Sequence, residues 1–157
     1  MNLINHPMKK KKITPGSLFT VALLVLFLQS FTNQQPKEPW TEKQLLQPAD
    51  LAKTLNDPRS KKPILLSIGF GGGIKGSKDL GAARDKEGID NLKKEVSALP
   101  KNADIVIYCG CCPFKDCPNV RPAFKLLNEM KFTNHKLLNL SHNLKVDWIE
   151  KGYPSDK

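Results

Sequence analysis

Apolar and polar residues follow two different periods along this chain of 157 residues. Apolar residues three or four apart predict helices over residues 48–55, 87–99 and 121–132. Compact apolar runs predict buried strands over residues 63–70, 105–108 and 136–140. The glycine-rich residues 69–76 predict a loop, and residues 146–151 a short helical turn. Because strands alternate with helices, we expect an α/β protein whose central, mainly parallel sheet carries helices on both faces.

The N-terminal residues have a different pattern from the rest of the chain. A basic block, residues 9–12, precedes an apolar run, residues 18–28, which is short for a membrane span of about 20 residues. This layout predicts that residues 1–32 are a signal peptide or a retained membrane anchor. Residues 33–39 then form a polar linker, and residues 40–157 a single domain. We therefore expect an exported protein, periplasmic or extracellular, that contacts the membrane only through its N-terminal segment.

The formal net charge is +10, from 25 basic and 15 acidic residues. The lysines are dispersed, and no basic stripe is interleaved with aromatic residues, so we expect no nucleic-acid partner. A modest positive field can instead attract small anions.

The four cysteines of the chain all lie within nine residues: Cys109, Cys111, Cys112 and Cys117. The run directly follows the predicted strand at residues 105–108 and precedes the helix predicted from Arg121. A thiolate in a loop between a strand and a helix N-terminus is stabilised by the backbone N–H groups there. The pattern therefore indicates sulfur chemistry, with a structural disulfide pair or a small metal site as alternatives.

In this order, the segments resemble the rhodanese-like family of sulfurtransferases over roughly residues 40–154. The resemblance rests on the apolar strand at 64–68, the turn GSKDLGA at 76–82 and the strand and cysteine at 105–109. It also rests on a helix that opens near Arg121 and on the ending DWIEKGYP at 147–154. It implies a rhodanese-like fold, sulfane-sulfur transfer and no cofactor.

By position, Cys109 matches the family's catalytic cysteine, which carries sulfur as a persulfide. The resemblance implies that the backbone N–H groups from Gly110 onward stabilise the anion. It also implies that Arg121 binds a small anionic sulfur donor such as thiosulfate. The chain departs from the family in its loop, because eleven residues separate Cys109 from Arg121 where the family has about four. The glycines of residues 69–73 also replace an aspartate-containing turn.

Cys111, Cys112 and Cys117 lie outside the family pattern. They could resolve a persulfide on Cys109 as a disulfide, or pair with one another; a Cys112–Cys117 pair would leave Cys109 free. Cys109 and Cys112 form a C-x-x-C motif, but the segments that follow do not suit a thioredoxin fold. Four ligands within nine residues are crowded for a tetrahedral ion, so we expect no metal. The alternatives are a thiol redox protein with a thiol partner protein, a zinc- or copper-handling protein, and an inactive rhodanese-like binding module.

Overall fold

The computed structural model describes residues 37–70 and 73–156. The predicted signal peptide or anchor and most of the predicted linker lie outside the described residues, so these expectations stay predictions. Residues Glu38–Lys157 form one compact unit. Within the described ranges, no helix has the length and apolar character that crossing a membrane requires.

A five-stranded sheet organises this unit, with the strand order β1-β5-β4-β2-β3. Every pairing between neighbouring strands is parallel. The strands are β1 (Leu45–Leu46), β2 (Ile64–Ser67), β3 (Lys78–Asp79), β4 (Ile105–Tyr108) and β5 (His135–Leu138). The cysteine run therefore follows the central strand, at the carboxyl edge where parallel α/β sheets place ligands.

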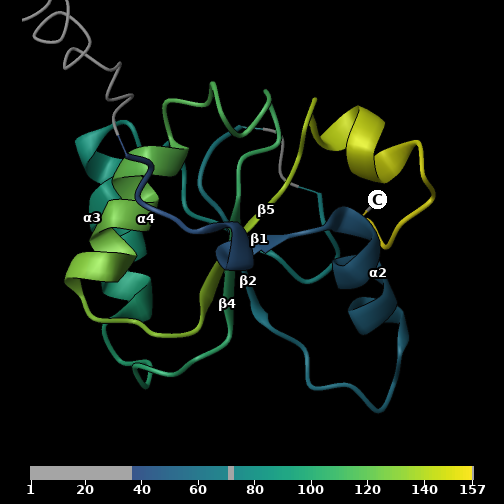
Figure 1. The fold of residues 1–157 in the computed structure, drawn as a ribbon, viewed down its shortest axis with the longest axis horizontal. Helices are drawn as coiled ribbons and strands as arrows, with labels where there is room; N and C mark the ends of the chain where they lie inside the picture. Colours follow the sequence, from purple (N-terminus) through teal and green to yellow (C-terminus); the bar gives the residue numbers. More distant parts are fainter. Residues whose placement is uncertain (1–36, 71–72, 157) are drawn as a thin grey trace, which may run out of the picture. The chain divides into compact units, whose positions relative to one another are not determined.

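Helices cover both faces of the sheet, as the sequence predicted. Helices α3 (Lys86–Val96) and α4 (Val120–Glu129) lie on one face, and α2 (Pro48–Asn56) lies on the other with the π-helix η2 (Lys145–Ile149) (Figure 1). A 3-10 helix, η1 (Glu42–Gln44), precedes β1. The expected α/β architecture is confirmed.

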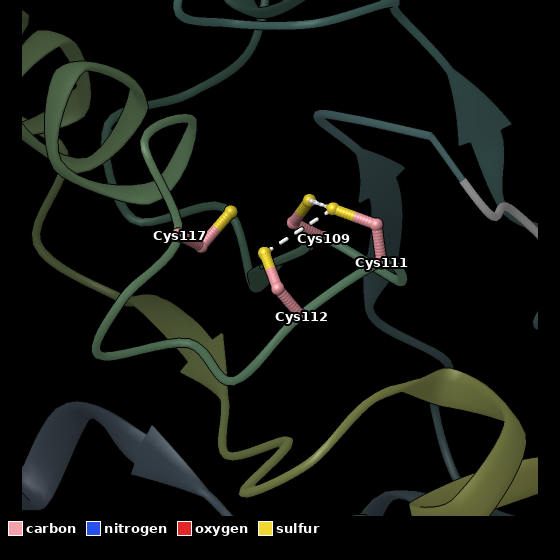
Figure 2. Close-up of side chains that lie close together, drawn as sticks. All are labelled: Cys109, Cys111, Cys112 and Cys117. Carbon is pink, nitrogen blue, oxygen red and sulfur yellow. Dashed lines mark hydrogen bonds between the residues drawn. The ribbon is translucent and has the colours of Figure 1, made fainter.

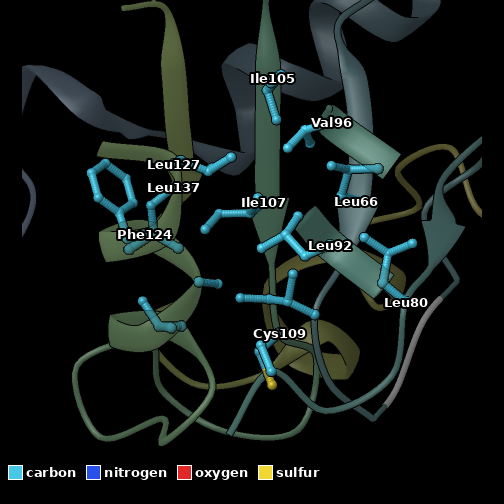
Figure 3. Close-up of a cluster of buried hydrophobic side chains, with 14 of the residues drawn as sticks. Leu66, Leu80, Leu92, Val96, Ile105, Ile107, Cys109, Phe124, Leu127 and Leu137 are labelled. Carbon is cyan, nitrogen blue, oxygen red and sulfur yellow. The ribbon is translucent and has the colours of Figure 1, made fainter. Parts of the chain in front are cut away.

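Successive side chains of β4 enter opposite sides of the core, which is the period-two rule for strands. Ile105, Ile107 and the following Cys109 belong to the apolar cluster under α3 and α4 (Figure 3). Val106 and Tyr108 belong to the cluster on the face of α2, together with the fully buried Trp148. The alternation therefore fixes the face on which the Cys109 sulfur lies.

The elements that periodicity did not predict are the shortest ones. Strands β1 and β3 are two residues long, and β3 is exposed at both residues, so neither carries an apolar repeat. Strand β4 has the predicted bounds. The other predicted elements differ by a few residues; β2, for example, is confined to Ile64–Ser67, and α3 ends at Val96.

Candidate functional site

Cys109 is the first residue after β4 and is only 3% exposed. Its sulfur lies against the backbone of Gly69, which follows β2, the neighbour of β4 in the sheet. A Cβ at position 69 would overlap the Cys109 sulfur and would lie 2.8 Å from the Asn119 side-chain nitrogen. Glycine is therefore required at position 69 because two chain segments and a thiol meet there.

The four thiols converge on one point above the carboxyl edge of the sheet (Figure 2). Their sulfur atoms all lie within 4.8 Å of one another, and all four cysteines are unpaired. The Cys111 sulfur lies 3.4 Å from the Cys109 sulfur and 3.2 Å from the Cys112 sulfur. Cys109 and Cys117 are buried, Cys112 is half-buried and Cys111 is exposed. The cluster therefore extends from the buried core at Cys109 and Cys117 to the protein surface at Cys111.

The surroundings of Cys109 favour its thiolate. Its pKa falls from 9.0 to about 5, chiefly because the Cys117 thiol faces its sulfur. The backbone N–H of Cys111, the Asn119 amide and the Cys111 thiol also favour the anion, while burial opposes it. Cys109 is therefore ionised at neutral pH, which is the reactive state of a cysteine nucleophile.

The thiols of Cys111 and Cys117 keep their protons. Partial desolvation of its sulfur by the loop, together with the thiols of Cys112 and Cys109, raises the pKa of Cys111 to about 12 although the residue as a whole is exposed. The pKa of Cys117 is also raised, first by its interaction with Cys109 and then by burial. The thiolate at Cys109 therefore lies beside two protonated thiols, those of Cys111 and Cys117, in accordance with the cost of placing like charges close together.

Asn119 is a residue of this site that was not predicted from the sequence. Its side-chain Nδ2 donates to the Cys109 sulfur at 3.4 Å, and its Oδ1 accepts from the backbone N–H of Arg84 at 2.9 Å. Asn119 immediately precedes α4 and is 2% exposed. An asparagine at a helix start is usually interpreted as a capping residue. Its position at the end of the cysteine loop was the feature of the sequence that could have indicated a role in the site.

Arg121 lies in the first turn of α4, after the cysteine loop, and interacts with groups outside the cysteine cluster. Its guanidinium pairs with Glu38 at 2.5 Å and lies 5.6 Å from the centre of the Trp40 ring. Gly110 is buried, and its carbonyl accepts from the backbone N–H of Leu144. The backbone N–H that favours the Cys109 thiolate belongs to Cys111. The anion-binding roles expected of Gly110 and Arg121 stay predictions.

The thiols are close enough to be considered as ligands of one soft metal ion. Thiolates around a tetrahedral zinc at about 2.3 Å lie roughly 3.8 Å from one another. The separations of 3.2 and 3.4 Å, and the upper limit of 4.8 Å, bracket that value. Small shifts could form such a site, so metal handling stays an alternative interpretation of the cluster.

Comparison with known proteins finds matches among solved structures. No protein-family profile and no curated protein matches the chain. A rhodanese-like domain from Anabaena sp. is 19% identical with a TM-score of 0.52, over 72% of this chain and 78% of that domain. Wild-type EanB is 18% identical with a TM-score of 0.52, over 78% of this chain.

A cysteine variant of EanB in complex with hercynine matches at the same identity and TM-score. The chain spans 29% of the length of EanB. At this level of identity the likenesses concern the fold alone. The chain has a rhodanese-like α/β fold with a four-cysteine cluster at the carboxyl edge of its sheet.

Proposed function

We propose that this protein is a sulfurtransferase that carries sulfane sulfur as a persulfide on Cys109. The observation that carries the proposal is the environment of the Cys109 sulfur, whose pKa of about 5 makes it a thiolate at neutral pH. The position of Cys109 directly after β4, the central strand of a rhodanese-like fold, supports the same interpretation.

The proposed loading step uses a small anionic donor, for which thiosulfate is the model. The Cys109 thiolate attacks the outer sulfur of thiosulfate and displaces sulfite, which leaves with the electrons of the broken S–S bond. The product is a persulfide anion on Cys109. The donors that favour the Cys109 thiolate, namely the Cys111 N–H, the Asn119 amide and the Cys117 thiol, are suited to stabilise this anion too.

The test is thiocyanate formation from thiosulfate and cyanide by the reduced protein. We expect turnover by the wild type and its loss in Cys109→Ser, because a serine hydroxyl is not ionised at neutral pH. Intact mass after thiosulfate alone should show the gain of one sulfur atom, and peptide mapping should place it on Cys109. A wild-type protein that gains no sulfur, or that gains it on another cysteine, would contradict the proposal.

The second candidate is metal handling, and the convergence of four sulfur atoms within 4.8 Å favours it. It predicts that Cys112→Ser removes function as fully as Cys109→Ser does, and that metal analysis of the native protein finds bound zinc or copper. Sulfur transfer predicts that Cys112→Ser still loads sulfur on Cys109. The two functions therefore differ in one variant and one elemental analysis.

A further inference from the structure

The cysteine loop places a second thiol in contact with the sulfur of the proposed persulfide carrier, Cys109. The Cys111 sulfur lies 3.4 Å from the Cys109 sulfur, which is van der Waals contact between the two atoms that a disulfide would join. Cys111 is also the exposed member of the cluster, whereas Cys109 is buried. A disulfide between them would therefore be accessible to an external reductant on the Cys111 side.

We propose a further activity that rests on the proposed sulfur transfer: Cys111 resolves the Cys109 persulfide, releases sulfide, and makes the protein a dithiol-dependent sulfide-releasing enzyme. The Cys111 sulfur attacks the inner sulfur of the persulfide, which is the Cys109 Sγ. The Cys109–Cys111 disulfide forms, the bond to the outer sulfur breaks, and the outer sulfur leaves as HS⁻ with the proton of the Cys111 thiol. An external dithiol then reduces the disulfide, becomes oxidised to its own disulfide, and restores both cysteines.

The geometry distinguishes Cys111 from the other two thiols. Cys112 contacts the Cys111 sulfur at 3.2 Å and shows no such contact with Cys109. Cys117 is fully buried, so a disulfide that included it would be enclosed on both sides. Cys117 lies across the cluster from Cys111 in Figure 2 and favours the Cys109 anion, so we assign it a positioning role.

The state of Cys111 also sets the order of events. Because its pKa is raised to about 12, Cys111 is protonated at neutral pH and attacks more slowly than a thiolate would. The persulfide therefore persists long enough to react with a small external nucleophile such as cyanide. When no such acceptor is present, the thiol at 3.4 Å is the available nucleophile, and sulfide is the product.

The experiment is a single turnover of the fully reduced protein with stoichiometric thiosulfate and no acceptor. Sulfite, trapped sulfide and the mass of the alkylated protein are followed together. For the wild type we expect sulfite first, then an equal amount of sulfide, with loss of two hydrogens across Cys109 and Cys111. For Cys111→Ser we expect one equivalent of sulfite at the end point, formed at a rate that can differ because a thiol beside Cys109 is lost, together with a stable gain of one sulfur atom and no release of sulfide.

Cys112→Ser is the matched variant, since it changes an adjacent thiol in the same loop. It should release sulfide as the wild type does. Sulfide release that survives in Cys111→Ser, or that disappears in Cys112→Ser alone, would overturn the assignment of Cys111. Absence of sulfite and of any added sulfur in the wild type would instead refute the sulfur transfer itself, so the two failures are distinguishable.

Discussion

The acidity of Cys109 depends in part on a single side chain that can be removed without touching a thiol. Asn119→Ala deletes the amide that donates to the Cys109 sulfur at 3.4 Å. It also deletes the Oδ1 acceptor of the Arg84 N–H. Asn119→Asp is the matched variant, because it keeps an oxygen for Arg84 and replaces only the donor to the sulfur.

A hydrogen bond to a charged group contributes about 1.5–3 kcal/mol. The Asn119 amide lowers the pKa of Cys109 less than the Cys117 thiol and the Cys111 N–H do. We therefore take the lower end of this energy range for its hydrogen bond. Since one pKa unit corresponds to about 1.4 kcal/mol, Asn119→Ala should raise the pKa of Cys109 from about 5 to roughly 6. In Asn119→Asp a carboxylate at this distance would add a repulsion of roughly 5 kcal/mol at an effective dielectric constant of about 20. We therefore expect a larger rise there.

The assay is alkylation of Cys109 by iodoacetamide at a series of pH values, with peptide mapping to separate the four cysteines. At pH 5 the alanine variant should have about five times less thiolate than the wild type, while at pH 8 both are fully ionised. A thiolate with a pKa one unit higher is about threefold more nucleophilic, from a Brønsted coefficient of about 0.45. The variant should therefore react about twofold slower at pH 5 and about threefold faster at pH 8.

The diagnostic result is that the alanine variant is alkylated more slowly than the wild type at pH 5 and faster than the wild type at pH 8. Alkylation of the exposed Cys111 in the same samples is the internal control, because its pKa of about 12 should keep it slow throughout. A variant that is slower by the same factor at every pH would refute the reasoning. It would mean that Asn119 acts on the shape of the loop and not on the charge of the sulfur.

Three further changes test neighbouring features of the site. Gly69→Ala would place a methyl group onto the Cys109 sulfur, so sulfur loading should be lost and urea denaturation should show a loss of roughly 1–3 kcal/mol. Glu38→Gln releases Arg121 from its ion pair, so the KM for thiosulfate should fall if Arg121 binds the donor and stay unchanged if it does not. The folded pKa of Cys109 lies below its usual 9.0, so its stabilising contribution is present above pH 9 and is lost as the pH falls through 5. Under reducing conditions, denaturation curves of the wild type against Cys109→Ser should therefore diverge in favour of the wild type as the pH rises from 5 to 9.

Hydrophobic periodicity predicts the parts of this fold that are long enough to repeat. Residues 105–108 are predicted with the bounds that β4 has, because four consecutive buried residues leave a clear apolar run. Strands β1 and β3 are not predicted, since two residues cannot display a period. Each is defined by its hydrogen bonds to a neighbouring strand, which the sequence pattern does not reveal. Periodicity does not predict the order of the strands in the sheet, which the structure gives as β1-β5-β4-β2-β3.

Features of the site that depend on neighbouring residues could be predicted from the sequence, whereas contacts between residues far apart in the chain could not. The clustering of the four cysteines follows from their closeness in sequence, and the position of Cys109 follows from the end of β4. Gly69 and Asn119 act through contacts that only the folded sheet creates, since Gly69 is forty residues from Cys109 in the chain. Arg121 and its partner Glu38 are 83 residues apart, which is why the sequence did not predict this ion pair.

The enlarged loop changes the kind of group that stabilises the sulfur anion. Two of the four groups that lower the pKa of Cys109 are thiols, and thiols can be oxidised whereas backbone N–H groups cannot. A Cys112–Cys117 disulfide would leave Cys109 free, but it would remove the Cys117 S–H, which is the largest of those contributions. The pKa of Cys109 would then rise toward its usual 9.0, and less of it would be thiolate at neutral pH. A Cys112–Cys117 disulfide would therefore leave Cys109 unoxidised but would lower the fraction of Cys109 that is thiolate at neutral pH. Sulfur loading through Cys109 should accordingly be fastest when all four thiols are reduced.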